Sequence, residues 1–199
     1  MECIFSIHLH LKDLEVLKFL QNFFHNIGKI YIYENIEEAI FRVSSIKELE
    51  IIINHFDKYP LITQKWSDFM LFKQVFYLMK CKKHLTLEGI QEIVNIKASM
   101  NTKISLSAFS NIVPVIRLSV PLINSIDPFW FAGFSTGEAC FSLSLKKSPS
   151  SKLGETAWLR FIITQHIRDK YLINSFVNFF GCGKINQDSQ AKEAELFIM

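Results

Sequence analysis

Hydrophobic and polar residues follow regular periods along most of the chain, and two stretches do so in the same order. Residues 5–10 alternate as a strand with one buried face does, and Leu14, Leu17 and Leu20 then recur at helical spacing. Residues 161–185 repeat this succession. We therefore expect each stretch to fold as a strand, a helix and a second strand.

The two stretches also share identical residues. At an offset of 156 positions, with one residue deleted before the glycine, segments 5–30 and 161–185 match at ten positions. The matched residues are Phe5, Ile7, His10, Asp13, Asn22, Phe23, Phe24, Gly28, Lys29 and Ile30 with Phe161, Ile163, His166, Asp169, Asn178, Phe179, Phe180, Gly183, Lys184 and Ile185. An internal repeat decides the architecture, and here it favours two similar units, each with its Asp opening the helix.

The stretch between the copies carries further elements. Its pattern predicts a strand at 38–43, a helix from Ser45 with a capping box to Glu48, and helices over about 66–80 and 86–98. Asn, Ser and Pro then become frequent, as in a linker. We expect one unit over 1–100, a linker over 101–126 and a second unit over 127–199.

One predicted helix has unusual glycines. Asp127 and Pro128 are a natural helix start, and Gly133 and Gly137 follow on one face. Each glycine costs about 1 kcal/mol relative to Ala, but together they let another backbone come close, so we expect a partner helix. Glu138 ends this helix where an alternating strand begins, a place where a divalent cation could meet a carboxylate and phosphate oxygens.

Composition narrows the class of protein. The net charge of +3 does not by itself indicate a nucleic-acid partner, and 49% hydrophobic residues are ordinary for a folded domain. The four cysteines form no CxxC pair, so we expect reduced, buried thiols and no disulfide framework or zinc site. No segment has the roughly 20 apolar residues of a membrane span, and we expect no membrane partner.

The abundance of certain residues indicates that the coding genome is rich in A and T. Nineteen Phe beside seven Gly and five Pro are typical of A+T-rich codons, and the N-terminus lacks the features of a sorting signal. We expect a protein encoded and made in an organelle, the mitochondrion first and the chloroplast as the alternative.

The sequence WFAGFSTGEACFSL at 130–143 resembles the signature helix and first strand of the LAGLIDADG homing endonucleases. Residues 59–73, residues 84–101 and the two repeated stretches resemble later blocks of the same family's repeat, in the family's order. The resemblance implies an α+β fold of αββαββα repeats with saddle-shaped antiparallel sheets, here partial in both repeats.

The resemblance also implies roles for individual residues. In that family the last acidic residue of each signature helix ligates Mg²⁺ at the scissile phosphates, which here implies Glu138 as metal ligand and catalytic residue. The family's basic residue near the metal matches Lys65. The helix interface falls on Ala132, Gly133 and Gly137, and contacts to double-stranded DNA in the major groove fall on Ser142, Ser144, Lys146, Lys147 and Lys152.

Two departures and the repeat offset bear on activity. Thr136 stands where the family usually has Asp, and Ala139 where it usually has Gly. The offset puts the counterpart of Glu138 about eighteen residues before Met1, and that of Lys65 beyond Met199. We expect the isolated chain to cut DNA poorly unless it self-associates or is joined to upstream sequence, because two-metal hydrolysis needs carboxylates from both helices.

Three functions remain open from the sequence. The leading hypothesis is an intron-encoded, Mg²⁺-dependent, site-specific homing DNA endonuclease, or a partial form of one. The rival is a splicing maturase that binds its host intron RNA, which Thr136 and the absent first signature helix favour; the third is a decayed, inactive fragment.

His8 and His10 share a strand face as a metal pair would, but no third ligand is near them in the sequence.

Overall fold

The computed structural model describes residues 2–100, 111–121, 125–186 and 193–198, and it divides into two compact units. The first unit comprises Met1–Leu61 and Lys65–Ser119, and the second comprises Ile62–Gln64 and Val120–Met199. Parts of the expected linker, residues 101–110 and 122–124, lie outside the described residues. Its stretch 111–119, which we call the strap, belongs to the first unit.

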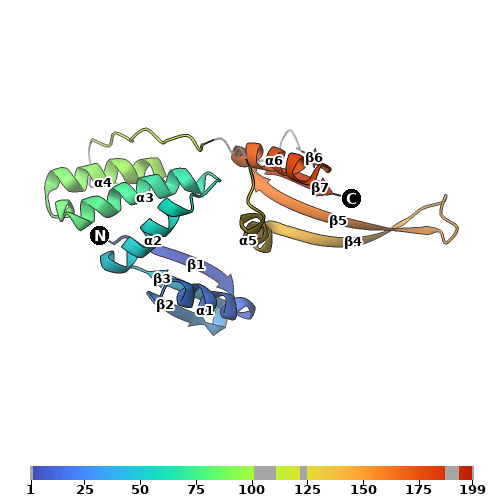
Figure 1. Ribbon diagram of the computed structural model, residues 1–199, viewed down its shortest axis with the longest axis horizontal. Helices are drawn as coiled ribbons and strands as arrows, with labels where there is room; N and C mark the ends of the chain where they lie inside the picture. Colours follow the sequence, from blue (N-terminus) through green and yellow to red (C-terminus); the bar gives the residue numbers. More distant parts are fainter. Residues whose placement is uncertain (1, 101–110, 122–124, 187–192, 199) are drawn as a thin grey trace. The chain divides into compact units, whose positions relative to one another are not determined.

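The first unit is built on a three-stranded antiparallel sheet (Figure 1), in the order β1-β3-β2. Alternation along the central strand buries Ala39, Phe41 and Val43 completely, as the two-residue period requires. The strands are β1 (Phe5–His10), β2 (Lys29–Tyr33) and β3 (Glu38–Val43), and the short 3₁₀ turns are η1 (Leu11–Asp13), η2 (Glu34–Ile36) and η3 (Lys83–Leu85).

Four helices complete this unit and confirm the predicted pattern. They are α1 (Leu14–Phe23), α2 (Ile46–Lys58), α3 (Lys65–Lys80) and α4 (Leu87–Met100). The capping box at the start of α2 was a wrong prediction, because the Ser45 side chain makes no cap hydrogen bond; its backbone oxygen accepts from Leu49 instead. The core joins the sheet to α2 and α3 through side chains such as Ile52 and Phe76.

One histidine of α2 lies inside a ring cluster at the edge of this core. His55 packs edge-on against Phe24 at 5.1 Å between ring centroids and contacts Phe56 at 5.2 Å. Burial, aided by the charge of Lys58, lowers the pKa of His55. The folded unit therefore holds this imidazole preferentially in its neutral form.

The second unit has a four-stranded antiparallel sheet in the order β4-β5-β7-β6, with α6 packed on it. The order β5-β7-β6 repeats β1-β3-β2, so the sequence repeat is also a structural one, and β4 is an additional edge strand. The elements are α5 (Pro128–Glu138), β4 (Ala139–Lys147), β5 (Glu155–His166), the 3₁₀ turn η4 (Ile167–Asp169), α6 (Lys170–Phe180), β6 (Lys184–Asn186) and β7 (Glu193–Ile198).

The repeated strand-to-helix corner differs from its prediction in one respect. The side chains of Asp13 and Asp169 make no cap hydrogen bond to the helices that follow them. The ring of His10 caps the preceding turn instead, accepting from the Lys12 amide at 3.1 Å, and His166 does the same in the second unit. Asp169 is buried and accepts a hydrogen bond from the Gln64 amide at 2.8 Å, which the sequence did not indicate.

The strap has no regular secondary structure (Figure 1), and polar side chains of α4 bond to its backbone within its first five residues. Every fourth residue of α4 bonds to the backbone of every second residue of the strap, because a helix rises about 6 Å in four residues and an extended chain about as much in two. The three pairs are Gln91 with Asn111 at 2.8 Å, Asn95 with Val113 at 3.1 Å and Ser99 with Val115 at 2.6 Å.

The cysteines and the hydrophobic segments complete the description. All four cysteines are free as expected, but only Cys3 is buried, with its pKa raised by that burial; Cys81, Cys140 and Cys182 are exposed, which corrects the expectation of buried thiols. Within the described ranges, every helix is too short or too polar to cross a membrane.

Candidate metal and nucleic-acid site

Glu138 occupies the end of helix α5, directly before strand β4. The helix starts as predicted, with Asp127 accepting from the amides of Phe129 and Trp130 at 2.9 Å and Pro128 in the first turn. Glu138 is exposed, and no hydrogen bond or ion pair to another described residue holds it. A carboxylate at the negative end of a helix dipole is unfavourable on its own, so a cation bound there would be favoured twice.

The donors around Glu138 determine which ion the site could take. Within the described parts of the chain, no group of three or more His, Cys, Asp or Glu side chains could enclose a metal. Mg²⁺ does not need such a cage, because it commonly binds one or two carboxylates together with water and substrate phosphates. Glu138 therefore fits as one protein ligand of a hard cation whose other ligands come from elsewhere.

The two faces of α5 differ sharply. Phe131 and Phe134 pack against Phe176 of α6, with ring centroids 5.0 and 5.5 Å apart. A Cβ added to Gly133 or Gly137 would meet no atom of the described chain within 4 Å, and Ala132 beside them is exposed. The small-residue face on which we expected a partner helix is thus open within the described residues.

Thr136, the departure from the family's Asp, does not point outward as a ligand. Its hydroxyl donates to the backbone oxygen of Ala132 at 2.8 Å, one turn back in the same helix. A Ser or Thr that bonds in this way satisfies itself locally. The side chain therefore adds no negative charge beside Glu138.

The β4–β5 hairpin presents a polar row that begins at Ser142, four residues after Glu138. Ser142 faces Arg160 across the strands, and Ser144 accepts from the Arg160 guanidinium at 3.0 Å. Lys146 continues the row, with its ammonium 5.8 Å from the centre of the Trp158 ring. Arg160 and Trp158 were missed from the sequence, because only the strand register shows that they join the serines.

Lys147 and Lys152 are placed differently from the polar row. Lys147 is exposed at the end of β4, where alternation turns it to the face opposite Lys146, and it pairs in register with Glu155. Lys152 is exposed in the turn that joins the two strands. The predicted contacts thus comprise one row of three residues and two separate lysines.

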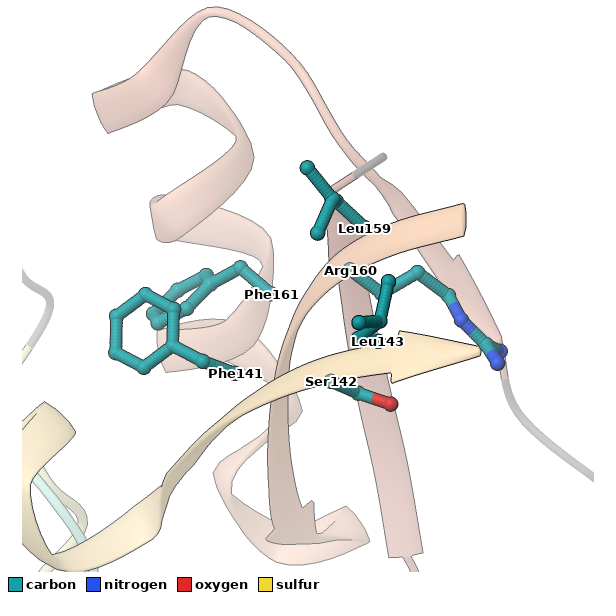
Figure 2. Close-up of a pocket in the computed structure, with 6 residues that line it drawn as sticks. All are labelled: Phe141, Ser142, Leu143, Leu159, Arg160 and Phe161. Atoms are coloured by element: carbon teal, nitrogen blue, oxygen red, sulfur yellow. The ribbon is translucent and has the colours of Figure 1, made fainter. Parts of the chain in front are cut away.

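The opposite face of the hairpin is apolar, and α5 and α6 cover only its end near Phe161, leaving the rest uncovered by the described residues. Figure 2 shows Phe141 and Phe161 side by side, on the other side of the strands from Ser142 and Arg160. With Leu143 and Leu159 these rings line a hollow of about 430 Å³. Phe141 is 86% exposed, so this face needs a covering element.

Lys65 begins helix α3 in the first unit and is exposed. It lines a pocket of about 600 Å³ together with Asp68, with Ser6 and His8 of β1, and with apolar side chains including Phe5 and Phe69. The lysine therefore lies beside the polar face of the first sheet. Its candidate partner Glu138 belongs to the second unit.

The polar face of the first sheet also explains the two histidines. His8 pairs with Glu38 at 2.8 Å and His10 with Glu37 at 3.4 Å, and no third ligand joins them among the described residues. Both histidines thus have a carboxylate neighbour on the surface of the sheet. The same face carries further groups that sequence reasoning did not single out, namely the exposed Lys29, Tyr31 and Tyr33 and the half-buried Arg42.

Comparison with known proteins decides the family. The sequence model of the LAGLIDADG endonuclease matches residues 1–76 and 131–199, which is most of the chain and includes Lys65 and Glu138. The chain belongs to the LAGLIDADG endonuclease family. The resemblance drawn from the signature helix is therefore confirmed.

Curated relatives are fungal and carry names that describe intron-encoded endonucleases. The chain is 42% identical over 188 residues to probable intron-encoded endonuclease 3 of Neurospora crassa, covering 91% of this chain and 34% of that protein. It is 39% identical over 208 residues to probable intron-encoded endonuclease 2 of the same species, covering 98% and 44%. The chain thus spans less than half the length of these two relatives.

Solved structures confirm the expected fold class. The LAGLIDADG enzyme I-SmaMI, bound to an uncleaved DNA target in the presence of calcium ions, superimposes with a TM-score of 0.94 at 41% identity, covering 99% of this chain and 68% of that one. The meganuclease I-AabMI bound to uncleaved DNA gives a TM-score of 0.89 at 35% identity, covering 99% and 69%.

Proposed function

We propose that this chain is part of a homing endonuclease, in which it reads DNA with its two sheets and contributes Glu138 and Lys65 to phosphodiester hydrolysis. The observation that carries the proposal is the exposed Glu138 carboxylate at the junction of α5 with a hairpin that presents a polar, partly basic row. The likeness to I-SmaMI bound to DNA, over 99% of this chain, supports it.

The proposed cofactor is Mg²⁺, ligated by Glu138. The open position of this side chain and its place at a helix C-terminus favour a cation, and the family as a whole supports a divalent one. Such an ion lowers the pKa of bound water and stabilises charge on phosphate oxygens. Lys65 would hold a phosphate oxygen or the developing charge, as a flexible ammonium does.

The proposed DNA contacts divide by chemistry. Ser142, Ser144 and Arg160 lie on a strand face, from which side chains can reach base edges in the major groove. Lys146, Lys147 and Lys152 are suited to phosphates, whose contacts make affinity depend on salt. Lys29 and Arg42, on the polar face of the first unit's sheet, are suited to further phosphate contacts.

Further partners follow from the open faces. The uncovered glycine face of α5 would receive a second helix of the same kind, supplied by a second copy of the chain or by adjoining sequence. We propose a mitochondrial location, because the relatives carry names of intron-encoded proteins, one of them from an intron of an ND4 gene in Podospora anserina.

The test is cleavage of a duplex that spans the exon junction at which the host intron is inserted. With the chain self-associated or joined to its adjoining sequence, and with Mg²⁺ present, we expect a single specific cut, with Glu138→Gln slower by at least a hundredfold. DNA affinity, measured by gel shift, should change by less than threefold. Chelation of the metal should stop cutting and leave binding.

A matched variant controls for general damage to the hairpin. Glu155 is another exposed carboxylate, at the first position of β5, and Glu155→Gln should cut at the wild-type rate. Equal cutting by wild type and Glu138→Gln would remove Glu138 from the chemistry. A wild-type chain that binds this duplex no better than an unrelated one would refute the proposed function.

A second function, an intron RNA-binding maturase, is favoured by one observation. Thr136 stands where the family usually has Asp, so the helix end carries one carboxylate fewer. Its hydroxyl donates to the backbone oxygen of Ala132. The same gel shift decides this point when host intron RNA is added as competitor. Retention of RNA in preference to the junction duplex would favour the maturase.

A further inference from the structure

The first turn of α3, which carries Lys65, is tied to the strap by two side-chain contacts. Ser67 is fully buried at 0% exposure, and its hydroxyl donates to the backbone oxygen of Leu118 at 2.7 Å. Asp68 accepts from the guanidinium of Arg117 at 2.6 Å. Two successive residues of one helical turn are thus held by two successive residues of the strap.

Arg117 does more than neutralise Asp68. The same nitrogen lies 3.4 Å from the backbone oxygen of Ser99, near the end of α4. The guanidinium therefore spans the start of α3 and the last turn of α4, and both Arg117 and Asp68 are partly shielded from water. An ion pair in such a setting is stronger and better defined geometrically than one on the open surface.

The first turn of a helix is the part that most needs such ties. Its amides have no partner within the helix, and helix ends open before helix centres do. Lys65 is the first residue of α3, so its position depends on contacts that hold this turn. A misplacement of about 1 Å in a catalytic group can cost about a hundredfold in rate.

We propose that Arg117 is a positioning residue, which acts through Asp68 and the strap to hold Lys65 in place; the proposal rests on the function proposed above for Lys65. Nothing in the family match or in the names of the relatives assigns a role to Arg117, which lies outside the matched residues 1–76 and 131–199. The strap thereby supports a residue of the proposed active site and is more than a spacer.

The first measurement needs no activity. Hydrogen exchange of the full chain, followed by mass spectrometry, reports on peptides covering 62–70 and 74–82. Arg117→Met should raise exchange in the first peptide at least tenfold and leave the second unchanged. Lys73→Met is the matched control, because it breaks the 2.6 Å pair of Lys73 with Asp57 further along the same helix. That control should leave residues 62–70 at wild-type exchange.

The second measurement separates positioning from binding. Arg117→Met should lower the single-turnover cleavage rate at least tenfold with less than a twofold change in DNA affinity. Arg117→Lys should recover most of the rate, because lysine can still pair with Asp68. Equal loss of rate and affinity, or failure of lysine to restore the rate, would overturn the positioning role.

The two measurements keep this proposal distinct from the proposed function. Unchanged exchange at 62–70 in Arg117→Met would overturn the strap contact even if the wild-type chain cuts DNA. A chain that self-associates or is joined to its adjoining sequence and still does not cut would refute the proposed function, and with it the role for Lys65, whereas fast exchange would still establish the tie to α3.

Discussion

The two copies of the repeat start from the same residues but acquire different neighbours. Phe5 in the first unit packs against Phe56 of α2, at 5.9 Å between ring centroids. Its counterpart Phe161 packs against Phe131 of α5, at 6.4 Å. Within the described residues, the first unit has no helix placed like α5, and the second has none placed like α2.

This difference teaches that a repeat needs helices from both sides to bury its strands and its helix end. Phe24, at the end of α1, is 5% exposed because His55 of α2 and Phe41 cover it. The matched Phe180, at the end of α6, is 38% exposed. Identical residues thus contribute different amounts to the free energy of unfolding, depending on which helix covers them.

The largest test of this comparison is truncation of the matched phenylalanines. Phe24→Ala should lower the free energy of unfolding of the first unit by about 3–5 kcal/mol, the usual cost of removing a buried ring. Phe180→Ala should cost the second unit about 1–2 kcal/mol, because part of that ring already lies in water. Urea unfolding followed by hydrogen exchange assigns each loss to its unit.

That pair also contains its own control. Both substitutions remove the same atoms at matched positions of the repeat, so the transfer of the ring itself is the same in the two cases. Equal losses at the two positions would show that α2 does not account for the burial of Phe24.

A smaller effect on stability separates the cost of a left-handed backbone conformation from the cost of a steric clash. Gly28 and Gly181 both have φ of +67°, but a Cβ on Gly28 would lie 2.5 Å from the backbone oxygen of Arg42, whereas one on Gly181 meets nothing within 4 Å. Gly181→Ala should cost about 1 kcal/mol from conformation alone, and Gly28→Ala about 2–4 kcal/mol. Thermal unfolding of each variant measures the difference, and similar shifts would contradict the close approach at Gly28.

The smallest effect is a dependence of stability on pH. It is expected in the first unit, because His55 belongs to α2. The pKa of His55 is lowered in the folded state, so the unfolded chain takes up the proton first as pH falls below about 6.5. Stability of the first unit should be complete above that value and decline below it. His55→Gln should flatten this decline, as seen in exchange-resolved urea unfolding at pH 7.5 and 5.5, with the second unit as reference. An unchanged decline in the variant would assign the effect elsewhere.

Much of the architecture could be read from the sequence because its signals are local. The alternation of β1, the leucine spacing of α1 and the Asp127-Pro128 start of α5 depend on neighbours within one or two turns. The repeat supplied the rest, because identical residues at one offset imply identical elements. Placement of Glu138 at the helix end needed only the signature.

The features that escaped prediction depend on residues far apart in the chain. Arg160 joins Ser144 only through the β4–β5 register, and Asp169 is buried because it meets an amide 105 positions earlier. One miss was local: the ring of His10 caps η1, whereas Asp13, which was expected to open the helix, makes no cap hydrogen bond to α1. The contacts of Arg117 were not predicted, because composition placed this residue in a linker.

The matched spacing of α4 and the strap limits how this joint can vary. Since four residues of helix correspond to two of the strap, insertion of one residue between 111 and 117 would turn every later side chain to the wrong face, whereas an insertion of two would shift the ladder by one whole rung. An engineer who wishes to lengthen the connection should therefore insert residues after Ser119 and leave the preceding nine residues unchanged.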